Sequence, residues 1–202
     1  MSKLNRPKQF DASREEFVTA ALDVFNRKGF HAASVDDIVT RAGRSKGGFY
    51  HHFASKDQLY IEVFEASLRA TVERLEAGMN SGTTVRETLD NLISKFEPSM
   101  TDRSKMSGAI EFILQSIRNE CAANTVKSIH TQTVDALAKL LTVAAQRGEL
   151  REHPDFHLIA EMMVASGRGI AVTTLMCDEI HRLPDLLRLL TDTALTGLSK
   201  AQ

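Results

Sequence analysis

The sequence predicts an all-α protein that has a small three-helix head at its N-terminus and a larger helical body behind it. Three observations favour this fold class. Apolar residues recur at helical spacing along most of the 202-residue chain. Helix-start signals of the Ser/Thr-x-x-Glu kind precede several of these segments. No segment sustains the alternation of apolar and polar residues that is typical of a strand.

The first expected helix begins at a capping box. Residues 1–11 are polar, carry three basic side chains and are expected to form a mobile arm. In residues 13–16 the serine hydroxyl can accept an amide hydrogen bond, and the glutamate can reach back to the start of the helix. Apolar residues then recur until Gly29, and glycine commonly ends helices. These signals predict a helix over residues 14–28.

Two short helices separated by a glycine are expected next. Ser34 and Ser45 are each positioned to start a helix, and Gly43 lies between the two segments. This arrangement predicts a helix-turn-helix at about residues 33–56. Apolar residues one turn apart share a helix face. Those of the head are expected to form a small core made of Phe17, Val35, Ile38, Phe49 and Phe53.

The body is predicted to consist of further amphipathic helices, so that the head spans residues 1–56 and the body residues 57–202. A capping box at residues 55–58 opens a long helix that ends between Gly78 and Gly82. A second box at residues 84–87 opens a helix that Pro98 is expected to stop. Later helices are expected at about residues 106–118, at about residues 121–147, from Pro154 onward and from Pro184 onward.

The formal net charge of −1 conceals an asymmetry between head and body. Residues 1–56 hold ten Lys and Arg against six Asp and Glu, a net charge of +4. Residues 57–202 hold fifteen against twenty, a net charge of −5. A basic head on an acidic body indicates a polyanionic partner if the basic side chains share one surface.

Several classes of protein are disfavoured by features that the sequence lacks. Residues 1–10 have no apolar core of a signal peptide, and no uninterrupted apolar stretch approaches membrane-spanning length. A cytoplasmic protein with no membrane partner is therefore expected. Cys121 and Cys177 are far apart and are expected to be reduced thiols. His153 and His157 are four residues apart but lack an evident third ligand, so no metal site and no cofactor are predicted.

The expected helix after Ser45 has one face with nothing apolar to bury. Lys46 and Tyr50 lie on this face, with Gly47 and His51 beside them. Lysine here can neutralise a phosphate and release counterions, and tyrosine and histidine can donate to phosphate oxygens. This chemistry suits binding to a nucleic-acid duplex.

Residues on either side of this helix extend the same pattern. Lys56 lies in the first turn of the next expected helix, where exposed amides and the helix dipole also favour a phosphate. Arg44, just before the helix, can reach a base edge or a phosphate. Gly47 and Gly48 each cost roughly 1 kcal/mol in a helix relative to alanine. A close approach of the backbone to another molecule would offset that cost.

Composition alone leaves other interpretations open. Exposed Lys, His and Tyr are also typical of a plain solvated helix face. A helical protein-interaction module has similar capped helices, but it lacks the steep salt dependence and sequence preference of a DNA-binding protein. An enzyme is disfavoured, because residues 43–48 lack the Gly-Lys-Ser/Thr ending of a phosphate loop. Residues 167–169 likewise lack the third glycine of a dinucleotide fingerprint.

The order and spacing of the residues separate these interpretations. The segments FVTAALDVFNRKGF, SVDDIVTRAG and SKGGFYHHFASKDQLY closely resemble the TetR family of bacterial transcriptional regulators. The close resemblance covers about residues 13–64, and the rest of the chain is similar only in architecture. It implies a sequence-specific DNA-binding regulator, most commonly a repressor, that is not an enzyme.

The resemblance also implies roles for residues of the head. Ser34 and Lys56 would each hold a phosphate, His51 would meet the DNA backbone, and His52 would reach a base or stay packed. The residues in or along the major groove would be Ser45, Lys46, Gly47, Gly48 and Tyr50. Two positions depart from the family pattern, since Arg44 replaces a small apolar residue and Gly48 often has a Thr, Ser or Ala counterpart. Base preference is therefore not transferable from a relative.

For the body, the resemblance implies a homodimer on a palindromic operator and a cavity for a small-molecule effector. The dimer would form through helices at about residues 154–177 and 184–200, where small residues allow close approach at Ala165, Gly167, Gly169 and Ala171. The effector is expected to be mainly apolar, because no charged cluster is evident among the candidate lining residues. These candidates are Phe96, Met100, Met106, Phe112, Ile113, Ser116 and Met162.

Overall fold

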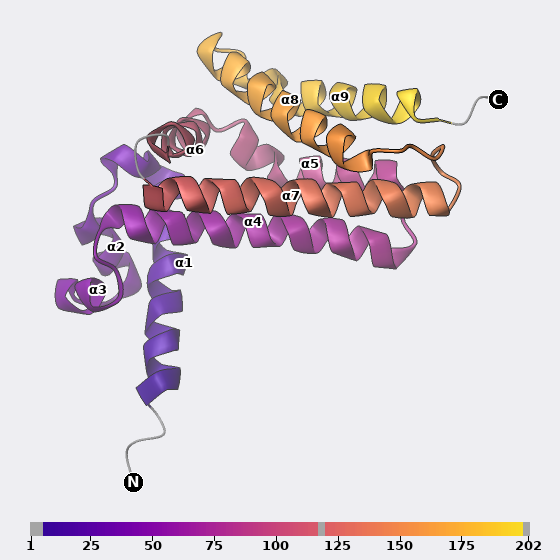
Figure 1. The fold of residues 1–202 in the computed structure, drawn as a ribbon. Coiled ribbons are helices and arrows are strands. Elements are labelled where there is room, and N and C mark those ends of the chain that lie inside the picture. Colours follow the sequence, from indigo (N-terminus) through magenta and orange to yellow (C-terminus); the bar gives the residue numbers. More distant parts are fainter. Residues whose placement is uncertain (1–5, 117–119, 200–202) are drawn as a thin grey trace. The chain divides into compact units, whose positions relative to one another are not determined.

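The computed structural model confirms an all-helical protein (Figure 1). It describes the backbone of residues 6–116 and 120–199 and the side chains of residues 12–66, 69–114 and 123–199. The described elements are α1 (Arg6–Ala32), α2 (Val35–Ala42), α3 (Lys46–His52), α4 (Lys56–Ser81), α5 (Val85–Met100), α6 (Arg103–Ser116), α7 (Glu120–Gln146), α8 (Phe156–Met176), the 3-10 turn η1 (Ile180–Arg182) and α9 (Leu183–Gly197).

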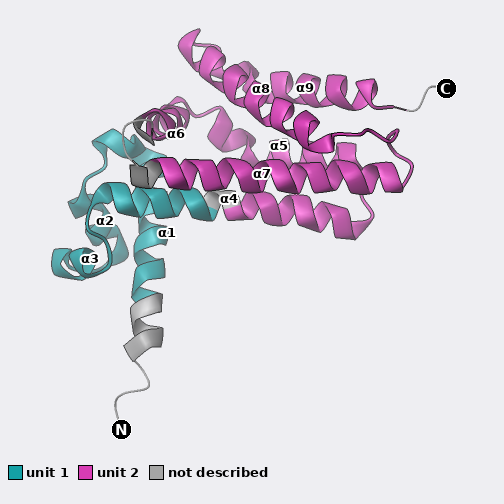
Figure 2. Ribbon diagram, viewed as in Figure 1, with its two compact units in different colours: residues 1–67 teal, residues 68–202 magenta. Residues whose placement is uncertain are grey.

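The chain divides into two compact units (Figure 2). Unit 1 comprises residues 1–67 and unit 2 residues 68–202. The division falls inside α4, which begins in unit 1 and ends in unit 2. The sequence places its boundary earlier, at residue 56, where the capping box opens this helix. A continuous helix offers no composition change at the point where its packing partners change.

An aromatic core holds α1, α2 and α3 together in unit 1. Phe17 of α1 is fully buried, and its ring centre lies 5.7 Å from that of Phe49 and 6.2 Å from that of Phe53. Both pairs meet edge to face, a favourable geometry for aromatic rings. Ile38 and Leu59 are also fully buried. The expected core is thus confirmed, except that Val35 is only half-buried at its margin.

Helix α1 is longer than the sequence predicts. It begins at Arg6, so residues 6–11 are helical and are not part of a mobile arm, while residues 1–5 lie outside the described residues. Ser13 lies inside the helix and is not its cap. Pro7 suits a first helical turn, and nothing between it and Gly29 breaks the helix. The interruption at Gly29 is confirmed, because its φ of 75° and ψ of 165° are not helical, although one more turn follows.

The ends of α2 and the start of α3 are fixed by local hydrogen bonds, as the sequence predicts. The Ser34 side chain accepts from the Asp37 amide, and Asp37 in turn accepts from the Ser34 amide, which completes a capping box. Gly43 ends α2 in the left-handed conformation with φ of 64°. Ser45 caps α3 through the Gly48 amide, at 3.1 Å.

Helices α5 to α9 and the end of α4 form unit 2. Within it, α7 packs against α6 and α8, and α9 packs against α8 and α5. The core between them is mainly aliphatic, and its most buried members are Leu75, Val134, Leu140, Leu141, Ala144 and Ala160. No strand occurs in the part of the chain that the structure describes.

Three helix ends in unit 2 differ from prediction. Pro98 does not stop α5, which continues to Met100, because a proline this close to the end removes only one of the last hydrogen bonds. Pro154 precedes α8, whose cap is Asp155, with the Leu158 amide donating to its carboxylate at 2.8 Å. Helix α6 begins three residues before the expected start, and the expected end at Arg118 lies outside the described residues.

Candidate nucleic-acid interface and ligand cavity

Helix α3 presents one polar face and buries the other. Phe49 is fully buried against α1, whereas the neighbouring Tyr50 is 57% exposed. Lys46, Gly47 and His51 are exposed as well. A tyrosine this exposed contributes little to the core, so its ring and hydroxyl are available to another molecule. The structure therefore exposes the four α3 residues that the sequence assigns to the polar face, Lys46, Gly47, Tyr50 and His51.

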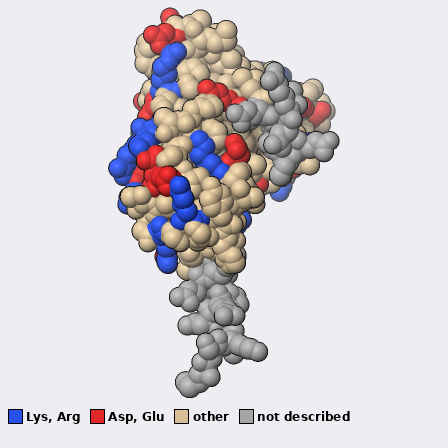
Figure 3. Space-filling model, turned by 90° about the vertical axis from the view of Figure 1, so that its left-hand side faces the viewer, with Lys and Arg blue, Asp and Glu red and all other residues tan. Residues whose placement is uncertain are grey.

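The basic residues of this region are paired with acidic ones. Lys46 Nζ lies 2.9 Å from Asp36 Oδ1, and this hydrogen bond raises the pKa of Lys46. Arg44 Nε donates to Glu16 Oε2 at 2.7 Å. Figure 3, which looks onto the side where α2 and α3 lie in Figure 1, shows acidic side chains lying next to basic ones. The head's positive charge is thus partly neutralised within the protein.

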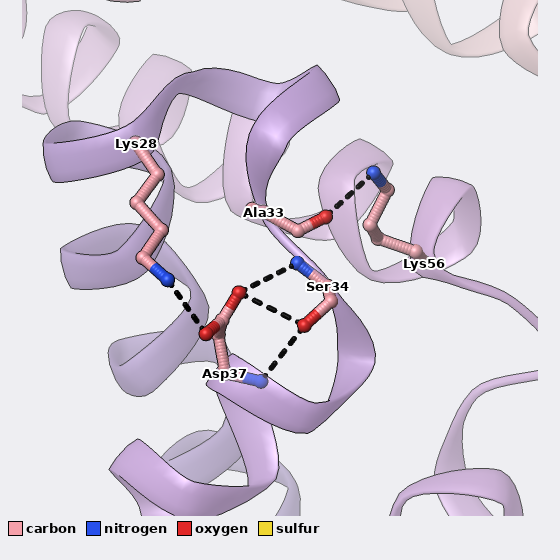
Figure 4. A network of polar contacts seen from close by, with 5 residues as sticks. All are labelled: Lys28, Ala33, Ser34, Asp37 and Lys56. Carbon is pink, nitrogen blue, oxygen red and sulfur yellow. Dashed lines mark hydrogen bonds and ion pairs between the residues drawn. The ribbon is translucent and has the colours of Figure 1, made fainter.

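Ser34 is occupied by its own helix cap (Figure 4). Its hydroxyl donates to Asp37 Oδ2 at 2.8 Å and accepts from the Asp37 amide at 3.1 Å. Lys28 Nζ lies 2.7 Å from the other carboxylate oxygen of Asp37. Hydrogen bonds from Lys28 and Ser34 lower the pKa of Asp37 to about 2. The Ser34 side chain holds the start of α2, and a phosphate there would have to share it.

Lys56 lies at the start of α4, but its ammonium group points back toward the end of α1 (Figure 4). Nζ donates to the Phe30 carbonyl at 2.7 Å and to the Ala33 carbonyl at 2.9 Å. It also lies 4.3 Å from the centre of the Phe30 ring. An ammonium group has three donors, so these two bonds leave one for a phosphate. The sequence gives no signal for these two hydrogen bonds of Lys56, because their acceptors are backbone carbonyls.

The two glycines of α3 are not required by the packing of the protein. A Cβ added at Gly47 would meet only Ser45 Oγ, at 3.9 Å. At Gly48 it would meet Ser45 Oγ at 3.4 Å and Phe17 Cζ at 3.8 Å, which are ordinary contacts. Neither glycine has a positive φ. Among the described residues, packing therefore offers no compensation for their helix-weakening effect.

The two histidines at the end of α3 differ in environment. His51 is exposed, whereas His52 is half-buried with its ring centre 5.8 Å from that of Phe17. Burial, followed by the charges of His51 and Arg14, lowers the pKa of His52. Of the two roles that the resemblance allows for His52, the structure matches the packed one.

Unit 2 contains a cavity of about 450 Å³ with a mainly apolar lining. This volume lies within the range of small-molecule sites. Residues of α4, α5, α6, α7, α8 and α9 contribute to its wall, among them Leu75, Leu92, Leu137, Met163, Arg168 and Leu187. Of the expected lining residues, Phe96, Met100 and Met106 do line it.

Other expected lining residues lie elsewhere. Met162 is 51% exposed on the opposite face of α8, and the neighbouring Met163 lines the cavity instead. One position along a helix is a rotation of about 100°, which is enough to exchange the inner and outer faces. Phe112 and Ile113 of α6 are not part of the lining, and the Ser116 side chain lies outside the described residues.

Three residues at these sites are not predicted from the sequence, namely Glu16, Asp36 and Arg168. Glu16 and Asp36 pair with Arg44 and Lys46 across helices, and no spacing rule connects them. Arg168 lines the cavity. The sequence does hold a signal for Arg168. This arginine follows the apolar Val164, which also lines the cavity, by four residues, so the two side chains share one helix face.

The histidines and cysteines considered for metal or redox chemistry are placed as follows. His153 Nδ1 accepts from the Asp155 amide at 3.1 Å, and His157 Nε2 lies 3.3 Å from Asp135 Oδ1. Cys177 is an exposed free thiol, and the Cys121 side chain lies outside the described residues. The described side chains include no group of three or more His, Cys, Asp and Glu residues placed to hold a metal ion.

Comparisons with known proteins agree with this architecture. Residues 17–63 match the family model described as bacterial regulatory proteins, tetR family. The fatty acid metabolism regulator protein of Bacillus subtilis is 24% identical over 196 residues, which cover 97% of this chain and 98% of that protein.

Two solved structures share the fold over almost the whole chain. A TetR-family transcriptional regulator from Mesorhizobium loti has a TM-score of 0.73 at 18% identity, covering 95% of this chain and 98% of that one. The regulator FadR from Bacillus subtilis, solved in complex with stearoyl-CoA, has a TM-score of 0.66 at 23% identity. It covers 91% of this chain and 98% of that one.

Replacing Gly47 by alanine should move stability and duplex binding in opposite directions. Because a Cβ has room there, we expect the free energy of unfolding to rise by roughly 0.5–1 kcal/mol in chemical denaturation. The methyl group would also keep a DNA backbone or base at a distance, so duplex affinity should fall at least tenfold in anisotropy titrations. Gly197→Ala in α9, where a Cβ meets nothing within 4 Å, is the control and should leave the duplex affinity unchanged. Unchanged duplex affinity in Gly47→Ala would rule out a close approach at this glycine.

Releasing Lys46 from its carboxylate should strengthen duplex binding. In Asp36→Asn the ammonium loses the partner that now lies 2.9 Å away. We expect affinity to rise several-fold, and the slope of log K against log salt to steepen by up to about 0.9 as one more phosphate is neutralised. Asp90→Asn in α5 changes the net charge equally and should have little effect. An equal gain in both variants would mean that only the total charge matters.

Proposed function

The chain belongs to the TetR family of bacterial regulatory proteins, and we propose that it is a homodimeric, cytoplasmic repressor released from an inverted-repeat operator by a small, mainly apolar effector. Family membership makes it a DNA-binding transcriptional regulator. The DNA contacts, the dimer surface and the effector class are the inferred parts, and each is supported by a separate observation.

The exposed face of α3 is the observation that carries the proposal. A helix of seven residues is too short to be stable alone, so its position is set by burial of Phe49. The opposite face then presents Lys46, Gly47 and Tyr50 to solvent. In helix-turn-helix proteins the second helix enters the major groove, and its N-terminal residues contact base edges. Helix α3 is that second helix here.

Phosphate contacts are proposed for residues around α3. Lys46 and Arg44 would exchange Asp36 and Glu16 for phosphates, because both ion pairs are exposed and exposed pairs contribute little free energy. Ser45, Gly48 and His51 would lie along the backbone or groove edge. Ser34 and Lys56 would contribute through the donors that their structural bonds leave, and Tyr50 through its hydroxyl.

The cavity supports binding of an effector in unit 2. Its lining is mainly apolar, which suits a ligand with a hydrocarbon part. Thr71 and Leu75 of α4 form part of the wall, and α4 begins in unit 1. A ligand that favours one position of α4 would shift the population between two states of the protein. We propose that this coupling releases DNA.

A stripe along α8 supports a homodimer. Leu158, Met162, Val172 and Met176 are exposed and repeat every three or four residues on one helix face, interrupted only by the small exposed residues Ala165 and Gly169. Of the four small residues that the sequence assigns to the dimer contact, Gly167 and Ala171 face inward, since a Cβ at Gly167 would lie 3.3 Å from Leu187 and Ala171 lines the cavity. Leu189 of α9 is 61% exposed and would extend the same surface.

A second copy explains this apolar surface better than a membrane does. Helix α8 is the one described helix long and apolar enough to cross a bilayer, by length and composition only. It nevertheless contains Glu161 and Arg168, and charged side chains inside a membrane are costly. A two-fold dimer would cover the stripe with an identical one and would also supply the two heads needed for an inverted repeat.

Selection of bound fragments from a random duplex library, with the full protein at near-physiological salt, tests the proposed DNA binding. We expect recovery of an inverted repeat with half-sites about one helical turn apart. A Tyr50→Ala, Lys46→Ala double variant should lose this enrichment while keeping the helical content of the native protein. Recovery of no preferred sequence, also after unfolding and refolding to remove a carried ligand, would contradict the proposal.

Gly169→Leu should separate the subunits without harming the protomer. A Cβ at Gly169 meets nothing within 4 Å, and leucine favours helix more than glycine does. In the dimer the larger side chain would hold two α8 helices apart. We expect light scattering to show a shift from dimer to monomer mass at micromolar concentration, with helical circular dichroism unchanged. Gly197→Leu, also with nothing within 4 Å, is the matched control. A wild-type monomer, or a dimer that tolerates Gly169→Leu, would exclude this interface.

A further inference from the structure

Arg168 is a cation set into a mainly apolar wall. It belongs to the cavity lining, on the same face of α8 as Val164, Gly167 and Ala171. Its side chain is only partly accessible to water, and this burial lowers the pKa of the guanidinium. Removing a charge from water is costly unless an opposite charge or several hydrogen bonds compensate. The position therefore requires an explanation.

The partner of Arg168 in the structure is neutral. Its Nη1 lies 3.0 Å from Nδ1 of His130 on α7. Arginine can only donate, so Nδ1 must accept, and the proton of His130 must lie on Nε2. Burial and the nearby Arg168 charge lower the pKa of His130, in keeping with the neutral form. The imidazole thus orients the guanidinium without neutralising it.

A carboxylate partner is missing among the described side chains. No Asp or Glu oxygen among them forms an ion pair with Arg168, whereas Arg44, Arg182 and Arg188, which are more peripheral, all pair with carboxylates. One of the five N–H donors of Arg168 is used by His130. The others include the pair that a guanidinium uses to bind a carboxylate with two parallel hydrogen bonds.

We propose that Arg168 binds the carboxylate of an amphipathic ligand whose aliphatic tail fills the cavity, with His130 as a positioning residue. This inference rests on the proposed function, since it names the effector class of the same cavity. It changes the expectation from a mainly apolar effector to a straight-chain carboxylic acid. An ionised carboxylate would supply the missing countercharge, and the tail would cover the aliphatic lining of α5, α7 and α9.

Calorimetric titration of the full protein with matched probes tests this assignment. The probes are dodecanoate, dodecanol and dodecanoyl-CoA, each below the concentration at which it forms micelles. For the wild type we expect dodecanoate to bind at least tenfold more tightly than dodecanol. Arg168→Met keeps the apolar stem and removes the charge, so it should abolish that preference while leaving dodecanol affinity within a few-fold. Arg182→Met, an exposed arginine outside the lining, is the control and should keep the preference.

The outcomes separate this inference from the proposed function. If neither dodecanoate nor dodecanol binds the wild type, the effector cavity itself is wrong. If both bind equally well, the cavity stands and the role of Arg168 is overturned. If Arg168→Met weakens dodecanoyl-CoA but not dodecanoate, the cation binds phosphate and not carboxylate. If the variant dissociates the dimer in light scattering, Arg168 pairs across subunits, and the proposal also fails.

Discussion

Burial of Phe49 and Phe53 against Phe17 sets the position of α3, and the other features of the head depend on it. The helix has only seven residues and contains two glycines, so its own hydrogen bonds would not keep it folded. Because one face is fixed by an aromatic core, the other face is presented to solvent in a defined orientation. Packing on the inside thus decides which side chains a partner molecule meets, and Ser34 and Ser45 fix where the two helices begin.

Basic side chains at the proposed DNA surface of the head lie next to carboxylates, so the local positive charge is smaller than the net charge of the head suggests. Several of the ten basic side chains of the head form ion pairs, of which Lys46–Asp36 and Arg44–Glu16 border the proposed DNA surface. Such exposed pairs contribute little to stability and exchange partners easily. In the proposed complex they would moderate the attraction to any polyanion, which would leave a larger share of the binding free energy to contacts that depend on the base sequence. Lys56, in contrast, is held by two carbonyls and a ring and ties the end of α1 to α4.

Unit 2 is organised around the two faces of α8. Its inner face carries Met163, Gly167 and Arg168 to the cavity, and its outer face carries the exposed stripe from Leu158 to Met176. The glycines illustrate the division, because Gly167 lies against Leu187 of α9 while Gly169 has open space beside it. One helix therefore serves two proposed surfaces, one for an effector and one for a second subunit. Ligand occupancy and subunit association are consequently expected to influence each other through this helix.

The sequence by itself determined the helical class, the caps at Ser34 and Ser45, the end of α2 at Gly43 and the polar face of α3, because these follow from neighbours within a few residues. It also pointed to the family whose model matches residues 17–63, since the head motif is local. It misjudged the start of α1 and the effect of Pro98, where local signals were outweighed by the surrounding helix. It also started α8 at Pro154, whereas the cap of that helix is Asp155. Only the tertiary structure decided that Met163 and not Met162 faces the cavity, that Lys46 and Arg44 are paired, and that Arg168 stands in the cavity wall without a carboxylate among the described side chains. These facts depend on how helices distant in sequence rotate and approach one another, and periodicity along a single helix does not encode that rotation.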